Sequence, residues 1–234
     1  MINDELLTAA VRNNAEWCRS MCRAHGLTGG AFGPRAWTSP HRTPLYYPDA
    51  VTLTGDAVAE DVLGGIDLTA SGASVKDAYA RLDLTAEGFR PLFDARWIHR
   101  SAGPSGLPDT AGHRPVRTPE ALAAWALAWR DGDAEEAALF RPALLDDPTV
   151  TVVGGYAPDG RILGGAVLST AAGVTGVSNL FTADGTDPAA VWAAALAAAD
   201  PALPVVGYES GDDLTAALAA GFGELGPLRV WLAA

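Results

Sequence analysis

Two adjacent side chains near the end of the chain could carry out acid–base chemistry. Tyr208 and Glu209 close the apolar stretch 205–209, so we expect them at the C-terminal end of a buried strand. The carboxyl group of Glu209 can act as a general base only if burial or a neighbouring charge raises its pKa. The alternative is a solvated or helix-capping carboxylate, and the sequence leaves both open.

A second group of candidates consists of polar residues and aromatic residues beside predicted strands. Ser178 and Asn179 interrupt an otherwise apolar strand, which indicates a bulge, a position facing a site, or hydrogen-bonded core groups. In the first half, Trp37, Tyr47 and His99 could contact a substrate, because aromatic side chains in loops beside a sheet often line ligand sites. Tight packing of those loops is the alternative.

The metal and thiol chemistry available to the chain is limited. The four histidines, at 25, 41, 99 and 113, are widely separated and follow no metal-ligand spacing, so no metal site is predicted. Cys18 and Cys22 lie four residues apart on a predicted helix and therefore share one face. We expect reduced core thiols there; a redox pair is the alternative.

The charge of the chain narrows its possible partners. The 234 residues carry a formal net charge of −12, and 49% of them are hydrophobic. A binder of nucleic acid or of an anionic membrane surface needs a basic face, so both classes are disfavoured. We expect a cationic or neutral small-molecule substrate. The acidic start of the chain and the absence of an apolar run of about 18 residues predict a cytoplasmic protein. Nothing in the sequence predicts an oligomeric state.

The elements that would position these residues fall into two halves. The N-terminal half is predicted to contain a helix over 4–24, a short strand at Trp37, a strand over 51–54, a short helix over 58–63, a helix over 75–86 capped by Ser74, and a strand over 92–99. The C-terminal half is predicted to contain helices from 118 and from 133, strands over 149–156, 161–169 and 174–181, a helix over 187–199, and a final strand, helix and strand after 205. The Pro- and Gly-rich segment 101–117 is the expected linker between domains 1–100 and 118–234.

The two halves share a weak internal similarity. Gly-Phe at 88–89 and at 221–222 follows a predicted helix each time and precedes a strand that contains arginine and tryptophan. The element order agrees over roughly 4–99 and 188–232, which suggests that the first half is a partial copy of the second. Coincidence is the alternative.

Residues 115–234 resemble the GNAT superfamily, the acyl-CoA-dependent N-acyltransferases. The resemblance rests on the order of elements, from a helical part through three antiparallel strands to the closing strand, helix, Gly221-Phe222 and strand. It implies an α/β fold with a mixed (α+β) sheet of GNAT type, here preceded by an N-terminal partial GNAT-like repeat. It also implies transfer of an acyl group from an acyl-CoA to a small amine. The alternative is a GNAT-fold protein without acetyl-CoA binding that serves as a small-molecule or partner-binding module.

The resemblance also assigns roles to particular residues. It implies that Asn179, Phe181, Thr182, Gly185 and Thr186 contact the cofactor, acetyl-CoA or another acyl-CoA. Tyr208 and Glu209 are the catalytic candidates, as the nearest substitutes for a tyrosine that many members carry. The family's phosphate-binding loop contains several glycines and an Arg or Gln, whereas segment 182–188 has one glycine and neither of these side chains. Asp184, Asp187 and Pro188 in that segment argue against ordinary acyl-CoA binding. Many members carry a tyrosine four residues before the glycine, where this chain has Ala217.

Overall fold

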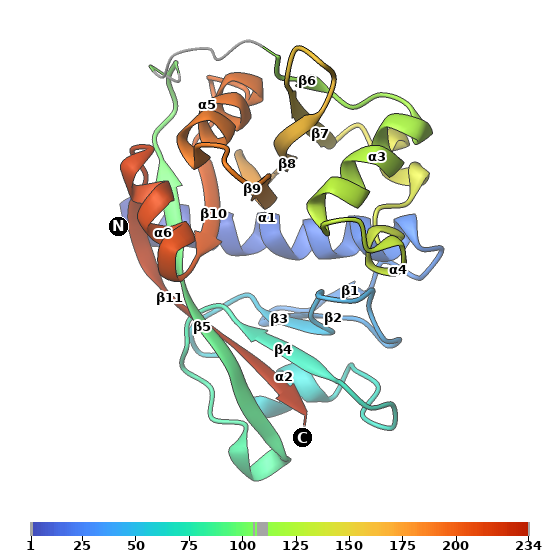
Figure 1. Ribbon diagram of the computed structural model, residues 1–234. Coiled ribbons are helices and arrows are strands. Elements are labelled where there is room, and N and C mark those ends of the chain that lie inside the picture. Colours follow the sequence, from blue (N-terminus) through green and yellow to red (C-terminus); the bar gives the residue numbers. More distant parts are fainter. Residues whose placement is uncertain (1, 105, 107–111, 234) are drawn as a thin grey trace. The chain divides into compact units, whose positions relative to one another are not determined.

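The computed structural model describes residues 2–104, 106 and 112–233, and these form two compact units (Figure 1). The first unit comprises Met1–Trp97 together with Glu224–Ala234, and the second comprises Ile98–Gly223. Residues 105 and 107–111 of the expected linker lie outside the described residues. The domain boundaries expected from the sequence stay a prediction.

The first unit is a mixed sheet with helices on both faces. Its elements are α1 (Ile2–Ala24), β1 (Ala31–Phe32), β2 (Ala36–Thr38), β3 (Ala50–Thr52), α2 (Ala59–Leu63), β4 (Ser74–Asp77), the 3-10 turn η1 (Thr85–Glu87), β5 (Phe89–Arg100) and β11 (Gly223–Ala233). The strand order is β1-β2-β3-β4-β11-β5. β3 and β4 are parallel, whereas β4 and β11 are antiparallel.

Alternation along β4 places the helices of this unit on opposite faces. Val75 joins a buried cluster with Val62 of α2 and with Trp231 of β11. The next residue, Lys76, points the other way, and its Nζ donates a hydrogen bond of 2.8 Å to Oδ1 of Asn14 on α1. Because successive strand residues face opposite sides of a sheet, α1 and α2 cover different faces.

The helix expected over 75–86 is wrong, because this segment begins with β4. Lys76 and Asp77 are almost fully buried, at 3% and 1% exposure. The carboxylate of Asp77 accepts backbone N–H groups of Tyr79 and Leu82, which turns the chain immediately after the strand. Within 74–88, all of it described, the only helical element is the three-residue η1 before Gly88. The helix that the proposed internal repeat requires at this place is therefore missing. The repeat itself stays a prediction.

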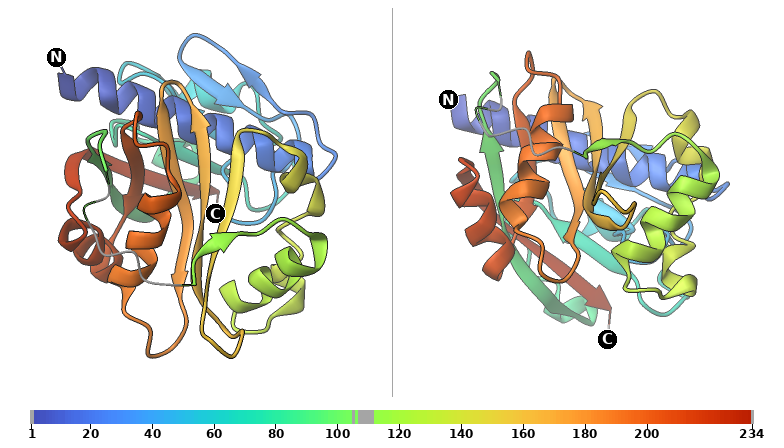
Figure 2. Two further views of the ribbon diagram at one scale, coloured as in Figure 1. Left: turned by 90° about the horizontal axis from the view of Figure 1, so that it is seen from above. Right: turned by 45° about the horizontal axis from the view of Figure 1, so that its top comes forward.

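The second unit contains the elements of the GNAT resemblance. They are β6 (Arg114–Pro115), α3 (Pro119–Trp129), α4 (Ala134–Ala137), the 3-10 turn η2 (Pro142–Asp146), β7 (Val150–Tyr156), β8 (Ile162–Ala171), β9 (Val174–Thr182), α5 (Pro188–Ala198), β10 (Val205–Glu209) and α6 (Gly211–Ala219). The strand order is β10-β9-β8-β7-β6, and Figure 2 shows β7, β8 and β9 side by side. β7, β8 and β9 are antiparallel, and β10 is parallel to β9.

Two consecutive glycines in β8 show how the helices pack on this sheet. A Cβ at Gly164 would meet Val191 of α5 at 2.6 Å, whereas a Cβ at Gly165 would overlap the indole of Trp125 on α3. α3 and α5 therefore cover opposite faces of β8, and both approach the backbone too closely for a larger residue. These two close approaches explain why β8 has glycine at both positions. On the α5 side, Trp192 packs against Phe222 at a ring distance of 4.7 Å.

Most predicted elements are confirmed, and so is the mixed α/β fold. Thr118 and Asp187 cap α3 and α5, each with proline at the first helical position. Among the described residues, no helix combines the length and the apolar character needed to cross a membrane.

Candidate functional site

The sheet of the second unit is irregular at β9, where the sequence has Ser178 and Asn179. Ser178 pairs with Val167 and Phe181 pairs with Gly165, so two residues of β9 lie opposite the single residue Ala166 of β8. Asn179 has a φ of 51°. This is a β-bulge, one of the alternatives expected from the polar pair, and it bends the strand and redirects the side chains that follow.

β9 and β10 are paired only where β10 begins. The registered partners are Val205 with Thr175 and Val206 with Gly176. Backbone is still close at the next residue, since a Cβ on Gly207 would meet the carbonyl oxygen of Val177 at 3.1 Å. Beyond this point come the bulge in β9 and the end of β10. Tyr208 and Glu209 therefore lie where the regular parallel pairing has stopped.

Glu209 combines partial burial with a strongly perturbed acidity. Partial burial of its side chain, together with the negative charge of Asp213, raises the pKa from 4.5 to about 8. Asp213 lies four residues later, in the first turn of α6. A carboxyl group with this pKa changes protonation near neutral pH, which is the property required of a general base.

Tyr208 and Glu209 do not share a face of β10. They are consecutive strand residues, so their side chains project to opposite sides of the sheet. Val205 lies in the buried cluster with Trp192 of α5 and Ala217 of α6, and Glu209 has the same alternation phase as Val205. Glu209 is thus on the helix-covered side with α6. Ala217 is fully buried there, so α6 offers no phenol at the position where many GNAT members have tyrosine.

The N-terminus of α5 uses its own backbone donors. Pro188 has no N–H group, the N–H of Ala189 donates to Oδ1 of Asp187 at 2.9 Å, and the N–H of Ala190 donates to the carbonyl oxygen of Asp187 at 3.0 Å. A pyrophosphate held at a helix N-terminus requires free N–H groups and positive potential. Here a carboxylate takes that place. The residues at this position do not fit the phosphates of an acyl-CoA.

The remaining cofactor candidates lie along the end of β9 and the following turn. The ring of Phe181 packs edge-on against Trp125 at 5.2 Å, on the α3 side of the sheet. Thr182 is half-buried at the end of the strand. Gly185 has a φ of 76° in a turn closed by the N–H of Thr186, which donates to Ala183 at 3.0 Å. Asn179, Phe181 and Thr182 thus share one strand, and Gly185 and Thr186 follow it.

The three substrate candidates are not brought together within one unit. Trp37 in the first unit has no exposed surface, and its indole N–H donates to the carbonyl oxygen of Gly29. Tyr47, also buried in that unit, packs edge-on against Trp17 at 5.9 Å. His99 belongs to the second unit and is half-buried; its Nδ1 is buried without a hydrogen-bond partner among the described residues.

The cysteines and the acidic residues form no further site in the described part of the chain. No group of three His, Cys, Asp or Glu side chains there could hold a metal ion. Cys18 and Cys22 are buried free thiols, and burial raises their pKa values to about 11 and about 12. Asp213 is the functional candidate that sequence analysis missed. Its spacing of four residues from Glu209 was a usable signal, but the helix begins between them.

Comparisons with known proteins bear on the fold. No protein-family model and no curated protein sequence matches the chain. Among solved structures, it is similar to a GCN5-related N-acetyltransferase from Kribbella flavida, with a TM-score of 0.58, 15% identity, and coverage of 96% of this chain and 95% of that one. It is also similar to a putative GNAT-family acetyltransferase from Novosphingobium aromaticivorans, with a TM-score of 0.55, 14% identity, and coverage of 87% and 89%.

A more distant similarity involves N-myristoyltransferase from Saccharomyces cerevisiae with bound myristoyl-CoA. The TM-score is 0.50 at 16% identity, over 70% of this chain and 51% of that one. Identities this low establish architecture and leave chemistry to the residues themselves. The similarity over nearly the full length and the strand order of the second unit agree with the resemblance seen in the sequence. The chain has the fold of the GCN5-related N-acetyltransferases.

Proposed function

We propose that the chain is an N-acyltransferase that transfers an acyl group from a thioester to a small amine, with Glu209 as the general base. The observation that carries this proposal is the Glu209 carboxyl, half-buried at the end of β10, with a pKa of about 8. Structures of the same fold support the reaction class, since two are named as acetyltransferases and a third binds myristoyl-CoA.

The proposed chemistry begins with a proton on the acceptor. At neutral pH an alkyl amine carries a positive charge, and it becomes nucleophilic only after losing a proton. The carboxylate of Glu209 accepts that proton. In the overall transfer the amine nitrogen bonds to the acyl carbon, the C–S bond of the thioester breaks, and a proton ends on the leaving thiol. Tyr208 stays a candidate for supplying that proton, although it projects from the other face of β10.

The charges around Glu209 favour a cationic acceptor. Asp212 and Asp213 lie in the first turn of α6, directly after β10. An ammonium group near these carboxylates gains Coulomb energy, and the net charge of −12 attracts cations at longer range. A small amine or polyamine is therefore the proposed acceptor class.

The acyl donor is the less defined partner. The resemblance implies an acyl-CoA, but the capped N-terminus of α5 does not fit its phosphates. The roles proposed for Glu209 and Tyr208 require a thioester but do not require CoA. The same observation favours a second candidate function, a GNAT-fold module that binds a small molecule or a partner without acetyl-CoA.

The test compares two thioesters that differ in the nucleotide. Acetyl-CoA and S-acetyl-N-acetylcysteamine, which has no phosphate, are each offered with a panel of small amines, and amide formation is followed by mass spectrometry. We expect transfer whose rate rises with pH and levels off above about 8. Glu209→Gln should lower the rate by about 100-fold or more. Glu135→Gln, at an exposed carboxyl of α4, should leave it unchanged.

The outcomes separate the two functions. Transfer with both thioesters supports the proposal, and transfer with acetyl-CoA alone shows that CoA is held by residues away from α5. If neither thioester reacts and neither changes the melting temperature at millimolar concentration, the binding-module function is supported. Equal rates for Glu209→Gln and the unaltered chain would reject Glu209 as the base.

A further inference from the structure

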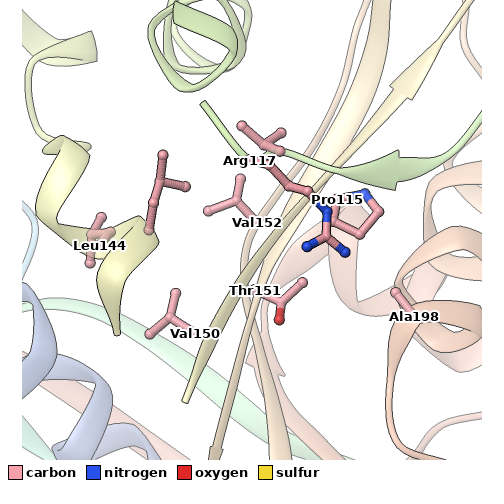
Figure 3. Close-up of a pocket in the computed structure, with 9 residues that line it drawn as sticks. Pro115, Arg117, Leu144, Val150, Thr151, Val152 and Ala198 are labelled. Atoms are coloured by element: carbon pink, nitrogen blue, oxygen red, sulfur yellow. The ribbon is translucent and has the colours of Figure 1, made fainter. Parts of the chain in front are cut away.

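The second unit contains a cavity of about 400 Å³ beside β6 and β7 (Figure 3). Leu144 and Val152 in its lining are only 1% and 2% exposed, so they offer almost no surface to a ligand. Its charged side chain, Arg117, is exposed to solvent. The cavity therefore indicates no ligand site. The strand β11 is more informative, because the sequence places it far from the other elements of its unit.

β11 belongs to the first unit but follows the second unit in the chain. The first unit consists of Met1–Trp97 and Glu224–Ala234, so the whole of Ile98–Gly223 separates β11 from the other strands of its unit. In the sheet β11 lies between β4 and β5 (Figure 1). Removing it would leave two strand edges with unpaired backbone groups, and such edges are a template for another strand. The place of β11 is therefore a strand-binding site within the first unit.

Side chains of β11 fit it to this place. Leu228, Val230 and Trp231 are 0%, 6% and 2% exposed. Arg229 lies among them in sequence, and its guanidinium donates two hydrogen bonds to the carboxylate of Asp94 on β5, at 2.6 and 3.0 Å. Burial holds the strand in the sheet, and the charge pair makes the site selective for a strand with a cation at this position.

The segment that joins β11 to the second unit lies between two buried anchors. Phe222 packs against Trp192 of α5 in the second unit, at a ring distance of 4.7 Å. Leu228 is fully buried in the first unit. Between them, residues 223–227 have the sequence Gly-Glu-Leu-Gly-Pro, and none of the five is buried. A change of chain direction within 223–227 therefore disturbs neither anchor.

We propose that β11 is exchanged between two copies of the chain, so that each copy donates residues 228–233 to the first unit of the other. The exchanged strand makes the same pairing with β4 and the same ion pair between Arg229 and Asp94 as it makes within one copy, so the dimer keeps these contacts. High protein concentration favours exchange, because a second copy then competes with the chain's own strand for the same place. The partner is a second copy of this chain, and the exchange is independent of the proposed acyl transfer.

The test reverses the charges of the ion pair in two separate full-length variants. Asp94→Arg places two arginines together, and Arg229→Asp places two aspartates together, so β11 is repelled within either variant. Exchange between the two variants gives each sheet a strand of opposite charge. We expect an equimolar mixture, refolded from urea at high concentration, to contain about tenfold more dimer than either variant alone, the effect of two restored ion pairs. Light scattering measures the dimer, and native mass spectrometry identifies it as a heterodimer.

A matched control reverses a charge pair that exchange of β11 cannot separate. Arg161 donates a hydrogen bond of 2.9 Å to Asp159, and both are exposed in the turn between β7 and β8. Asp159→Arg and Arg161→Asp each place like charges together, as the test variants do. Mixing these two variants should give no more dimer than either gives alone.

The unaltered chain provides a measurement that does not depend on any variant. Refolded from urea, it should form a dimer whose fraction rises with protein concentration and persists after dilution, because separation requires β11 to leave each sheet. The proposal is overturned if the mixture of Asp94→Arg and Arg229→Asp contains no more heterodimer than the control mixture. It is also overturned if the unaltered chain refolds, as judged by circular dichroism, and stays monomeric at every concentration.

Discussion

Replacing Glu209 with glutamine should make the chain more stable at alkaline pH. In the folded chain, burial and Asp213 raise the pKa of this carboxyl to about 8, whereas its ordinary value is 4.5. Between these two pH values the folded state keeps a proton that the unfolded state has lost. The contribution of Glu209 to stability therefore falls as pH rises through this window, and is constant above about 8. Glutamine is neutral throughout and has no such loss.

The two pKa values set the size of the effect. Each pH unit of difference corresponds to about 1.36 kcal/mol, so the full window gives an upper limit of about 5 kcal/mol. The Glu209 side chain is only half-buried, and solvent screens a partly exposed charge. We therefore expect the unfolding free energy of Glu209→Gln, relative to that of the unaltered chain, to increase by about 2–3 kcal/mol between pH 5 and pH 8.5.

Urea denaturation of both proteins from pH 5 to pH 9 measures this difference. Other carboxylates titrate in both proteins and cancel when the two unfolding free energies are subtracted. Asp213→Asn is a useful companion, because removing its charge should lower the pKa of Glu209 and move the transition to lower pH. A difference between Glu209→Gln and the unaltered chain that stays constant from pH 5 to pH 9 would refute the raised pKa and, with it, the assignment of the base.

Three further predictions concern the architecture. Gly165→Ala should destabilise the chain by about 1–3 kcal/mol in urea denaturation, whereas Gly226→Ala, where an added Cβ makes only ordinary contact, should cost much less; equal effects would contradict the packing. Asp187→Ala should cost about 1 kcal/mol by removing the cap of α5, and an unchanged urea midpoint would show that the cap contributes nothing. Cys18 and Cys22 should react with a maleimide at pH 8 far more slowly in the folded than in the urea-unfolded chain; equal rates would contradict their burial.

Much of the second unit could be predicted because its signals are local. Thr118-Pro119 and Asp187-Pro188 place a capping side chain and a fixed φ at consecutive positions, which sets a helix start with no help from distant residues. The turn between β7 and β8 likewise follows from its own Pro-Asp-Gly sequence. Where local chemistry and tertiary structure agree, a single sequence is sufficient.

The segment 75–86 shows where local signals fail. Its charged residues suggest the exposed face of a helix, but Lys76 and Asp77 are buried in β4. Lys76 is accommodated there because Asn14, more than 60 residues earlier, accepts a hydrogen bond from it. A buried charge is tolerated only with such partners. The local sequence pattern of this segment does not indicate that Asn14 will be its partner, so the strand could not be predicted from it.

The candidate site was predicted in part for the same reason. The polar pair Ser178-Asn179 in an apolar strand indicated the bulge, and the position of Glu209 at a strand end follows from the run before it. The raised pKa needed the fold, because it depends on burial and on where α6 places Asp213.

The capped N-terminus of α5 limits the kind of ligand that this part of the chain can bind. In the GNAT resemblance, the helix after the fourth strand of the family binds phosphates, so a free N-terminus of α5 would have suggested an anionic ligand there. Asp187 instead accepts the N–H of Ala189 and places a negative charge at the same point. Any anion that approached α5 would have to displace this cap and leave a carboxylate beside itself. An anionic substrate is therefore disfavoured at α5, whereas Asp212 and Asp213 in the first turn of α6 favour a cation beside Glu209.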